Sequence, residues 1–202
     1  MQGKKTRGKA QRKEQKEATR LRLLQAALEV FSGRGIVKTT TAEVAKAAKV
    51  AHGTVFVHFA SREDLITAVV EEFGVRMTDH VRRLMLQKDP TVKEVLEAHV
   101  QAVSRYEAFY ARLVGERALL SETARARLVI LQSAVAWCIG RAVEREQAAG
   151  TIRLLSPGLF FNTWLGLLHH YVCNPDLFAQ RRSVLDERGQ ALVEHFVSMI
   201  RK

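Results

Sequence analysis

The sequence predicts an all-α protein, in which an N-terminal three-helix domain containing a helix-turn-helix is followed by a C-terminal helical bundle. Apolar residues recur at helical spacing along most of the 202 residues, and no stretch alternates at period two for long. Helix start and stop signals punctuate this pattern, among them Thr-x-x-Glu capping boxes, a Ser-Pro pair and several glycines. Together these observations indicate about nine helices.

Four helices are expected in the first half of the chain, at about residues 17–32, 40–49, 53–59 and 61–87. Gly33 or Gly35 supplies the left-handed residue that ends the first helix. Thr40 and Glu43 form the capping box of the second helix. Ser61 caps the fourth helix, which is long enough to connect the small domain with the rest of the chain.

The second and third helices have the spacing of a helix-turn-helix, in which the second helix of the pair enters the major groove of DNA. We expect Val55 and Phe59 to face inward. The side chains expected to be exposed on the third helix are those of His52, Thr54, Val57 and His58. His52 and Thr54 are the best candidates for base contacts because the first turn of such a helix enters the groove. Val57 could touch a thymine methyl group.

The match extends beyond a generic helix-turn-helix. It consists of Thr-Thr-x-x-Val-Ala-x-x-Ala-x-Val from Thr40, Gly-Thr-Val-Phe-x-His-Phe from Gly53, and Ser-Arg-Glu-x-Leu from Ser61. This pattern closely resembles the DNA-binding domain of the TetR family of bacterial transcriptional regulators, over roughly residues 17 to 77. The resemblance implies that Phe56 and His58 face the DNA, and that Arg62 lies near a phosphate.

One position departs from the family, which most often has a tyrosine where this chain has Phe56. The tyrosine hydroxyl bonds a phosphate, whereas Phe56 would pack against a sugar or support the core. His58 could equally be a structural cap. The candidate DNA-contacting residues are therefore Lys38, Thr40, Thr41, His52, Gly53, Thr54, Phe56, Val57, His58 and Arg62.

Several of these residues are expected to meet phosphates. Lys38 lies at the entry to the second helix, where a phosphate could be bound by its side chain and by free amides. The amides of Gly53 and Thr54 would form a similar site at the start of the third helix. Contacts of Lys38 and Arg62 with phosphates would strengthen binding to any DNA sequence.

The charge distribution also points toward a polyanionic partner. The net charge is +11, and residues 1–22 hold nine cationic side chains against two carboxylates, which leaves +7 in this segment. We expect residues 1–16 to form a basic disordered arm, residues 17–77 the DNA-binding domain, and residues 78–202 a ligand-sensing and dimerisation domain. The arm could follow phosphates or enter a minor groove, or it could be a tail that only aids solubility.

The second half of the chain is expected to hold helices at about residues 91–113, 117–120, 121–150, 158–173 and 180–200. Thr91 and Glu94 form a second capping box, and Ser156-Pro157 is a strong helix start. The helix at 158–173 is apolar almost all round and must be covered on most sides. We expect a homodimer through the helices at 158–173 and 180–200, matched to a palindromic operator. A deep monomeric core is the alternative.

Aromatic residues with a few polar tips suggest a pocket for a small apolar or aromatic effector in the C-terminal domain. The candidate lining consists of Tyr106, Phe109, Tyr110, Trp137, Phe160, Asn162, Trp164 and His169. The alternative is that about half of these are ordinary core or interface aromatics. The TetR resemblance favours the pocket, since such regulators generally bind an effector between helices of this domain.

Other kinds of site find little support. His169 and Cys173 share one helical face, but two ligands without a second pair make a weak metal site, so no metal or other cofactor is expected. No catalytic motif is present. Cys138 and Cys173 fit a reduced, cytoplasmic protein. No apolar run of about 18 residues suggests a membrane span.

These observations favour a transcriptional regulator, most simply a repressor that a small-molecule effector releases from its operator. An architectural DNA-binding protein without an effector is the main alternative. An activator is a further alternative, and an enzyme that uses the histidine and cysteine patch is the remaining one.

Overall fold

The computed structural model describes the backbone of residues 2–87, 89–154, 156–179 and 183–202, with side chains described outside 2–10, 80 and 87. The described residues form α-helices, one short 3-10 helix (η1) and an isolated bridge between Ile152 and Arg201. In order, the helices are α1 (Gln2–Arg34), α2 (Thr41–Ala47), α3 (His52–His58), α4 (Arg62–Gln87), α5 (Val92–Ser104), α6 (Glu107–Gly115), η1 (Arg117–Leu119), α7 (Glu122–Ala148), α8 (Pro157–Cys173), α9 (Pro175–Phe178) and α10 (Val184–Ser198). The all-α prediction is confirmed.

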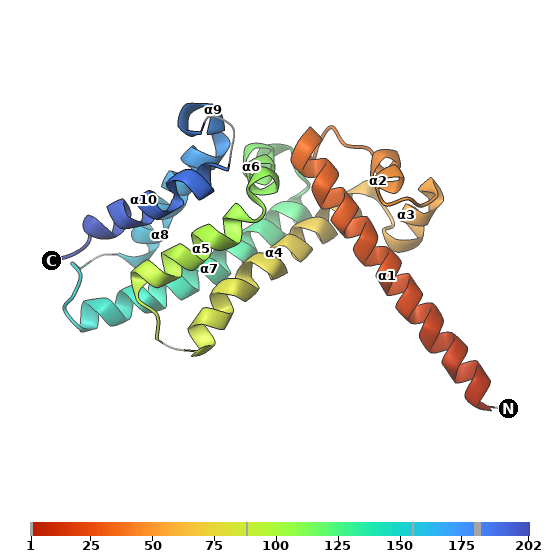
Figure 1. Cartoon of the computed structure of the whole chain (residues 1–202), viewed down its shortest axis with the longest axis horizontal. Helices are drawn as coiled ribbons and strands as arrows, with labels where there is room; N and C mark the ends of the chain where they lie inside the picture. The colour runs from red at the N-terminus through yellow and green to blue at the C-terminus, as the bar shows by residue number, and fades with distance from the viewer. Residues whose placement is uncertain (1, 88, 155, 180–182) are drawn as a thin grey trace.

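The helices are arranged as a small head and a larger body (Figure 1). We call α1 to α3 with the start of α4 the head, and the remaining helices the body. In the body, α5 packs against α4, α7 and α10, while α8 packs against α6 and α7. Buried residues from Leu23 in α1 to Ile200 at the end of the chain belong to one continuous hydrophobic cluster. Head and body therefore share a core.

The sequence signals for helix starts are confirmed. Both capping boxes form, with Thr40 accepting a hydrogen bond from the Glu43 amide and Thr91 accepting one from the Glu94 amide. Pro157 occupies the first turn of α8. These signals act within one helical turn, so the sequence determines them without help from distant residues.

The expected helix at 91–113 is instead divided into α5 and α6. The chain turns at Tyr106, whose amide donates to the carbonyl of Val103 at 2.9 Å. Apolar residues continue at helical spacing on both sides of this turn, so the periodicity carries no sign of it. The turn directs α6 against α1 of the head. A further short helix, α9, follows α8 directly, and the expected start of the last helix at 180 lies outside the described residues.

The expected disordered arm at residues 1–16 is helical from Gln2 onward, as the first part of α1. This segment has no proline and is rich in lysine, arginine and glutamine, which have high helix propensity. Its high charge suggested disorder, but the same residues favour a helix once α1 is nucleated farther along. Figure 1 shows this part of α1 projecting away from the rest of the molecule.

The long helix α4 connects head and body without a break. It runs for 26 residues and passes through the expected domain boundary at residue 77. Met77 and Val81, on either side of that boundary, are both buried in the common core. The fourth helix is thus a structural part of both units.

One described helix, α7, is long and apolar enough to cross a membrane by length and composition, which the search for uninterrupted apolar runs missed. Several of its side chains, including Leu128, Val135 and Ile139, are buried in the bundle. A core helix of a soluble bundle meets the same criteria of length and composition. Packing in the body accounts for part of the apolar character of α7, while Val129, Ile130 and Trp137 are exposed.

Candidate nucleic-acid interface

Helices α2 and α3 form a helix-turn-helix on the side of the head. Val44 and Ala45 of α2 pack with Val55 of α3 in the core. Between the helices, Lys49 has a φ of 56°, and the Val50 amide donates to the Ala45 carbonyl at 3.0 Å. The left-handed conformation of Lys49 ends α2 and helps to set the angle between α2 and α3.

The outer face of α3 is open to solvent. His52, Phe56 and Val57 are exposed, with Val57 at 66% of its maximal accessible surface. Val55 and Phe59 are buried, as the sequence predicted. A helix that presents a ring nitrogen, an aromatic ring and a branched aliphatic side chain on one face has the shape and chemistry to enter a major groove.

Contacts within the motif hold His52 in place. Its Nε2 lies 2.9 Å from the Thr41 hydroxyl of α2, and its ring lies edge-on to Phe56 with centroids 5.4 Å apart. Thr41 and Phe56 therefore have a role as supports for His52, whether or not they contact DNA. Because the Thr41 hydroxyl engages Nε2, Nδ1 is the ring nitrogen left for an incoming base.

Two of the groups expected to contact DNA are engaged in local hydrogen bonds. The Thr40 hydroxyl is engaged by Glu43 through the capping box. The Thr54 amide, expected to be free, donates to the Ala51 carbonyl at 2.9 Å. The Thr54 side chain is half-buried, in contrast to the expected exposure. At Gly53 no atom lies within 4 Å of the position that a Cβ would occupy, so this part of α3 is open.

His58 was expected to be exposed toward DNA, but the structure makes it half-buried. Its Nδ1 is buried without a hydrogen-bond partner among the described residues. Burial lowers the pKa of His58, and the nearby α1 cations Lys16 and Arg20 lower it further. A neutral ring held near α1 fits a structural role for this residue better than groove contact.

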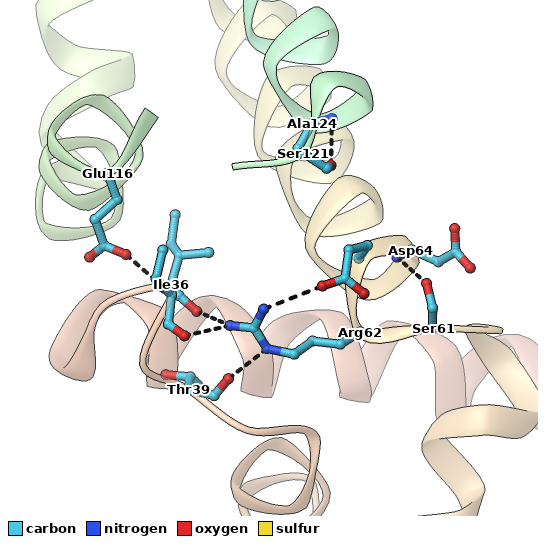
Figure 2. A network of polar contacts seen from close by, with 10 residues as sticks. Ile36, Thr39, Ser61, Arg62, Asp64, Glu116, Ser121 and Ala124 are labelled. Atoms are coloured by element: carbon cyan, nitrogen blue, oxygen red, sulfur yellow. Dashed lines mark hydrogen bonds and ion pairs between the residues drawn. The ribbon is translucent and has the colours of Figure 1, made fainter. Parts of the chain in front are cut away.

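Arg62 was expected to project toward a phosphate, and this prediction is wrong. Its guanidinium turns back into the head and donates to three backbone carbonyls of the loop between α1 and α2 (Figure 2). The acceptors are Ile36 at 2.8 Å, Val37 at 2.7 Å and Thr39 at 3.0 Å. Arg62 thus fastens the start of α4 to the loop that leads into α2. Sequence reasoning missed this because backbone carbonyls carry no sequence signal.

The same loop is held from the other side by the body. Glu116, at the end of α6, accepts a hydrogen bond from the Val37 amide at 2.7 Å (Figure 2). A Cβ at Gly35 would lie 2.6 Å from the Glu116 carboxylate, and Gly35 has a φ of 92°, so this approach requires glycine. Lys38, next in the loop, is exposed. No sequence signal marked Glu116 as a link between body and head.

Residues 23–69, which include the whole helix-turn-helix, match the family described as bacterial regulatory proteins, tetR family. This stretch is of the TetR type. The HTH-type transcriptional repressor Rv3405c of Mycobacterium tuberculosis is 33% identical over 85 residues. That stretch covers 41% of this chain and 43% of the relative, so the chain matches less than half the length of this relative.

Solved TetR-type structures resemble the whole chain. NemR from E. coli, in its reduced form, superposes with a TM-score of 0.74 at 17% identity, over 91% of this chain and 97% of that one. FadR from Bacillus subtilis, solved in complex with stearoyl-CoA, superposes with a TM-score of 0.71 at 19% identity, over 88% of this chain and 97% of that one. At these identities the likeness establishes the TetR fold of head and body together.

The body brings the expected effector-pocket residues together only in part. Tyr106, Phe109 and Tyr110 surround Phe73 of α4, with ring centroids 5.1 to 5.9 Å apart. Phe160 and Trp164 form a second cluster around Phe196 of α10. Trp137 is 63% exposed, and Asn162 is also on the surface. Helical spacing identifies apolar faces, but it does not show which faces meet.

One buried histidine, His99, and one half-buried histidine, His169, lie in these clusters. The Trp164 indole N–H donates to His99 Nδ1 at 3.0 Å, and His169 Nε2 lies 2.8 Å from the Tyr110 hydroxyl. Burial lowers the pKa of each histidine to about 4, with a smaller contribution from His169 at His99 and from Arg117 at His169. Burial also raises the pKa of Tyr110. Both rings are therefore neutral at pH 7.

The histidine and cysteine patch does not form a metal site in the part of the chain that the structure describes. No group of three or more His, Cys, Asp or Glu side chains there could hold an ion. His169 is engaged by Tyr110, while the Cys173 thiol contacts the Ala111 carbonyl at 3.9 Å. Burial raises the pKa of both Cys138 and Cys173, so neither is an activated thiolate.

Helix α8 has one buried face and one open face rather than being covered all round. Phe160, Phe161 and Trp164 point into the core, whereas Leu159 is 70% exposed and Gly166 and His170 are exposed on the other side. The outward residues of α10 are mainly polar. The expected dimer contact through α8 and α10 would use these open faces, and it stays a prediction.

Proposed function

We propose that this chain is a homodimeric, cytoplasmic, one-component transcriptional regulator that represses from a palindromic operator and is released by a small-molecule effector. The observation that carries the proposal is the open face of α3, with His52 positioned by Thr41, within a stretch that matches the TetR family. The net charge of +11 favours a polyanionic partner. The M. tuberculosis relative over the same stretch is named a repressor.

The effector part of this proposal is supported by the body. FadR of B. subtilis, which shares the fold, was solved with stearoyl-CoA. In this chain, Glu116 of the body contacts the loop that leads into α2, so a change in α6 would reach the head directly. An effector would shift DNA affinity only as far as it binds the two conformers differently. No catalytic role is proposed for any residue.

The dimer part is supported by the exposed apolar Leu159 on α8 and by the symmetry argument for palindromic sites. Two copies joined through α8 and α10 would present two α3 helices to one face of DNA. Half-sites would then lie about one helical turn apart. Sedimentation velocity of the purified chain tests the dimer without DNA.

Selection of bound DNA from a random duplex pool, at near-physiological salt, tests the function. We expect enrichment of a palindromic consensus, because paired α3 helices read two half-sites of opposite direction. If no sequence is enriched, and binding disappears as salt rises, the chain is an architectural DNA-binding protein and the regulator proposal is wrong.

Lys38→Ala is expected to weaken binding to every DNA sequence and to reduce the slope of log affinity against log salt by about 1. Lys38 is exposed beside α2, where a side chain can release one counterion from a phosphate. His52→Ala should instead cost about 1 to 3 kcal/mol on the selected operator only. Titrations of operator and random duplexes at several salt concentrations measure both effects.

Lys93→Ala, on α5 of the body, is the matched control that removes a cation far from the head. It should leave both the affinity and the salt slope unchanged. Equal losses on operator and random DNA for His52→Ala would show that this residue does not read bases.

A further inference from the structure

A cleft lies where the body meets the head, between α1 and α6. Its volume is about 470 Å³, within the range of roughly 300 to 1,000 Å³ typical of small-molecule sites. Leu28 and Ser32 line it from α1, and residues 104–109 with Ala111 line it from the turn and α6. Val172, Pro175 and Ser183 close its other side. The cleft therefore contacts both head and body.

The walls of this cleft are mostly apolar. Leu28, Phe109 and Val172 line it as buried core residues, of which Leu28 is the most exposed at 6%. Tyr106 is half-buried, and its ring packs edge-on against Phe73 with centroids 5.9 Å apart. Rigid rings and aliphatic side chains of this kind suit the apolar body of a small molecule.

The cleft holds charges of both signs, which differ in their partners. Glu107 is fully engaged, because it accepts hydrogen bonds from the Ser183 hydroxyl at 2.6 Å and from the amides of Val184 and Leu185 at 2.8 and 2.9 Å. Ser104 donates to Asp186. Arg105 is exposed at the rim, and its guanidinium has no hydrogen-bond or ion-pair partner in the described part of the chain. The cleft thus offers one unpaired cation above an apolar floor.

A second groove, between α4 and α7, has a different character. It measures about 400 Å³, and three of its four charged lining residues are in ion pairs, while the fourth, Arg20, lies over the Phe59 ring. Arg127 binds Glu71 at 2.9 Å, and Glu72 binds Arg76 at 2.8 Å. Because most of its charge is neutralised by these pairs, this groove serves as the comparison site.

We propose that the cleft between α1 and α6 binds a small amphipathic anion, with its apolar body against Leu28 and Tyr106 and its acidic head group on Arg105. Such a ligand would touch α1 of the head and α6 of the body at once. Since α6 also carries Glu116, bound to the Val37 amide, occupancy would act on the loop before α2. This regulatory consequence rests on the proposed function, whereas binding in the cleft does not.

The test is a fluorescence titration of the full chain, without DNA, using 8-anilinonaphthalene-1-sulfonate, which carries aromatic rings and one sulfonate. We expect saturable binding with one site per chain. Ala108→Trp, which fills the cleft from an exposed position on α6, should weaken binding at least tenfold. Arg105→Gln should weaken it about tenfold, as expected for loss of one charge-assisted contact. Arg105→Lys should retain most of the affinity.

Two controls separate this site from general apolar binding. Ala134→Trp, in the groove between α4 and α7, should leave the affinity unchanged. Binding of the neutral probe N-phenyl-1-naphthylamine should be weakened by Ala108→Trp but not by Arg105→Gln. Circular dichroism confirms that each variant remains folded.

If the wild type and Ala108→Trp bind 8-anilinonaphthalene-1-sulfonate with equal affinity, the ligand does not bind in this cleft and the proposed site is wrong. If Arg105→Gln weakens binding of the neutral and anionic probes equally, the cleft does not select an anion and the proposed ligand class is wrong. A selection experiment that enriches no operator would remove the regulator proposal while leaving this titration unaffected. The two proposals therefore fail separately.

Discussion

Replacing Arg62 with alanine is expected to lower the free energy of unfolding by about 2 to 4 kcal/mol, since three hydrogen bonds from a charged donor are lost. Three loop carbonyls would lose their protein partner, and the part-buried guanidinium would leave a gap beside the start of α4. The loop before α2 would then no longer be fixed. Operator binding should fall for this reason, without a phosphate contact being removed.

Urea unfolding and DNA titration of the same variants distinguish these roles. Arg62→Lys keeps the charge but cannot donate in the fork that reaches three carbonyls, so it should recover only a small part of the stability. Lys38→Ala is the matched control, with weaker DNA binding and unchanged stability. If Arg62→Ala leaves the free energy of unfolding unchanged and reduces the slope of log DNA affinity against log salt, Arg62 contacts a phosphate after all.

The second large effect is a loss of stability in acid that originates at His99. Burial lowers the pKa of His99 to about 4 from 6.5. Above pH 6.5 the ring is neutral in both folded and unfolded chains, so stability is complete. Between pH 6.5 and 4 the unfolded chain takes up a proton that the folded chain does not, and stability falls by about 3 kcal/mol. Below pH 4 this contribution levels off.

His99→Asn tests the assignment, because the Asn side chain can still accept from the Trp164 indole but does not titrate. This variant should be less stable at pH 7.5, where the smaller side chain leaves a cavity, yet its stability should fall less between pH 6.5 and 4 than that of the wild type. Trp164→Phe leaves His99 buried and titratable, so its acid loss should persist. Parallel curves for wild type and His99→Asn would contradict the assignment.

The sequence predicts the features of this fold that depend on neighbours within a turn or two of helix. The capping residues Thr40 and Thr91, the helix end at Gly35 and the buried face of Val55 and Phe59 all follow from local pattern. The open face of α3 is predicted for the same reason. The family pattern over the head adds the assignment of α3 as the helix that faces DNA.

Features that depend on distant partners were not predictable. Arg62 and Glu116 bind the backbone of a loop, and the sequence carries no mark of which side chain a carbonyl or amide will meet. The turn at Tyr106 is concealed because apolar spacing continues across it. Trp137 and Trp164 look alike in sequence, but one lies on the surface and the other at the centre of the body. Their difference is decided by how α7 and α8 pack.

The unbroken helix α4 has a consequence for recombination between relatives. A chimera that joins this head to another body at residue 77 would cut the helix between two buried side chains, Met77 and Val81. A junction at Pro90, beyond the end of α4, would keep the helix whole. The new body would also need an acidic residue at the position of Glu116, so that it can accept the hydrogen bond from the Val37 amide. Exchange of DNA specificity in this fold is thus easier by changing side chains on α3 than by exchanging whole domains.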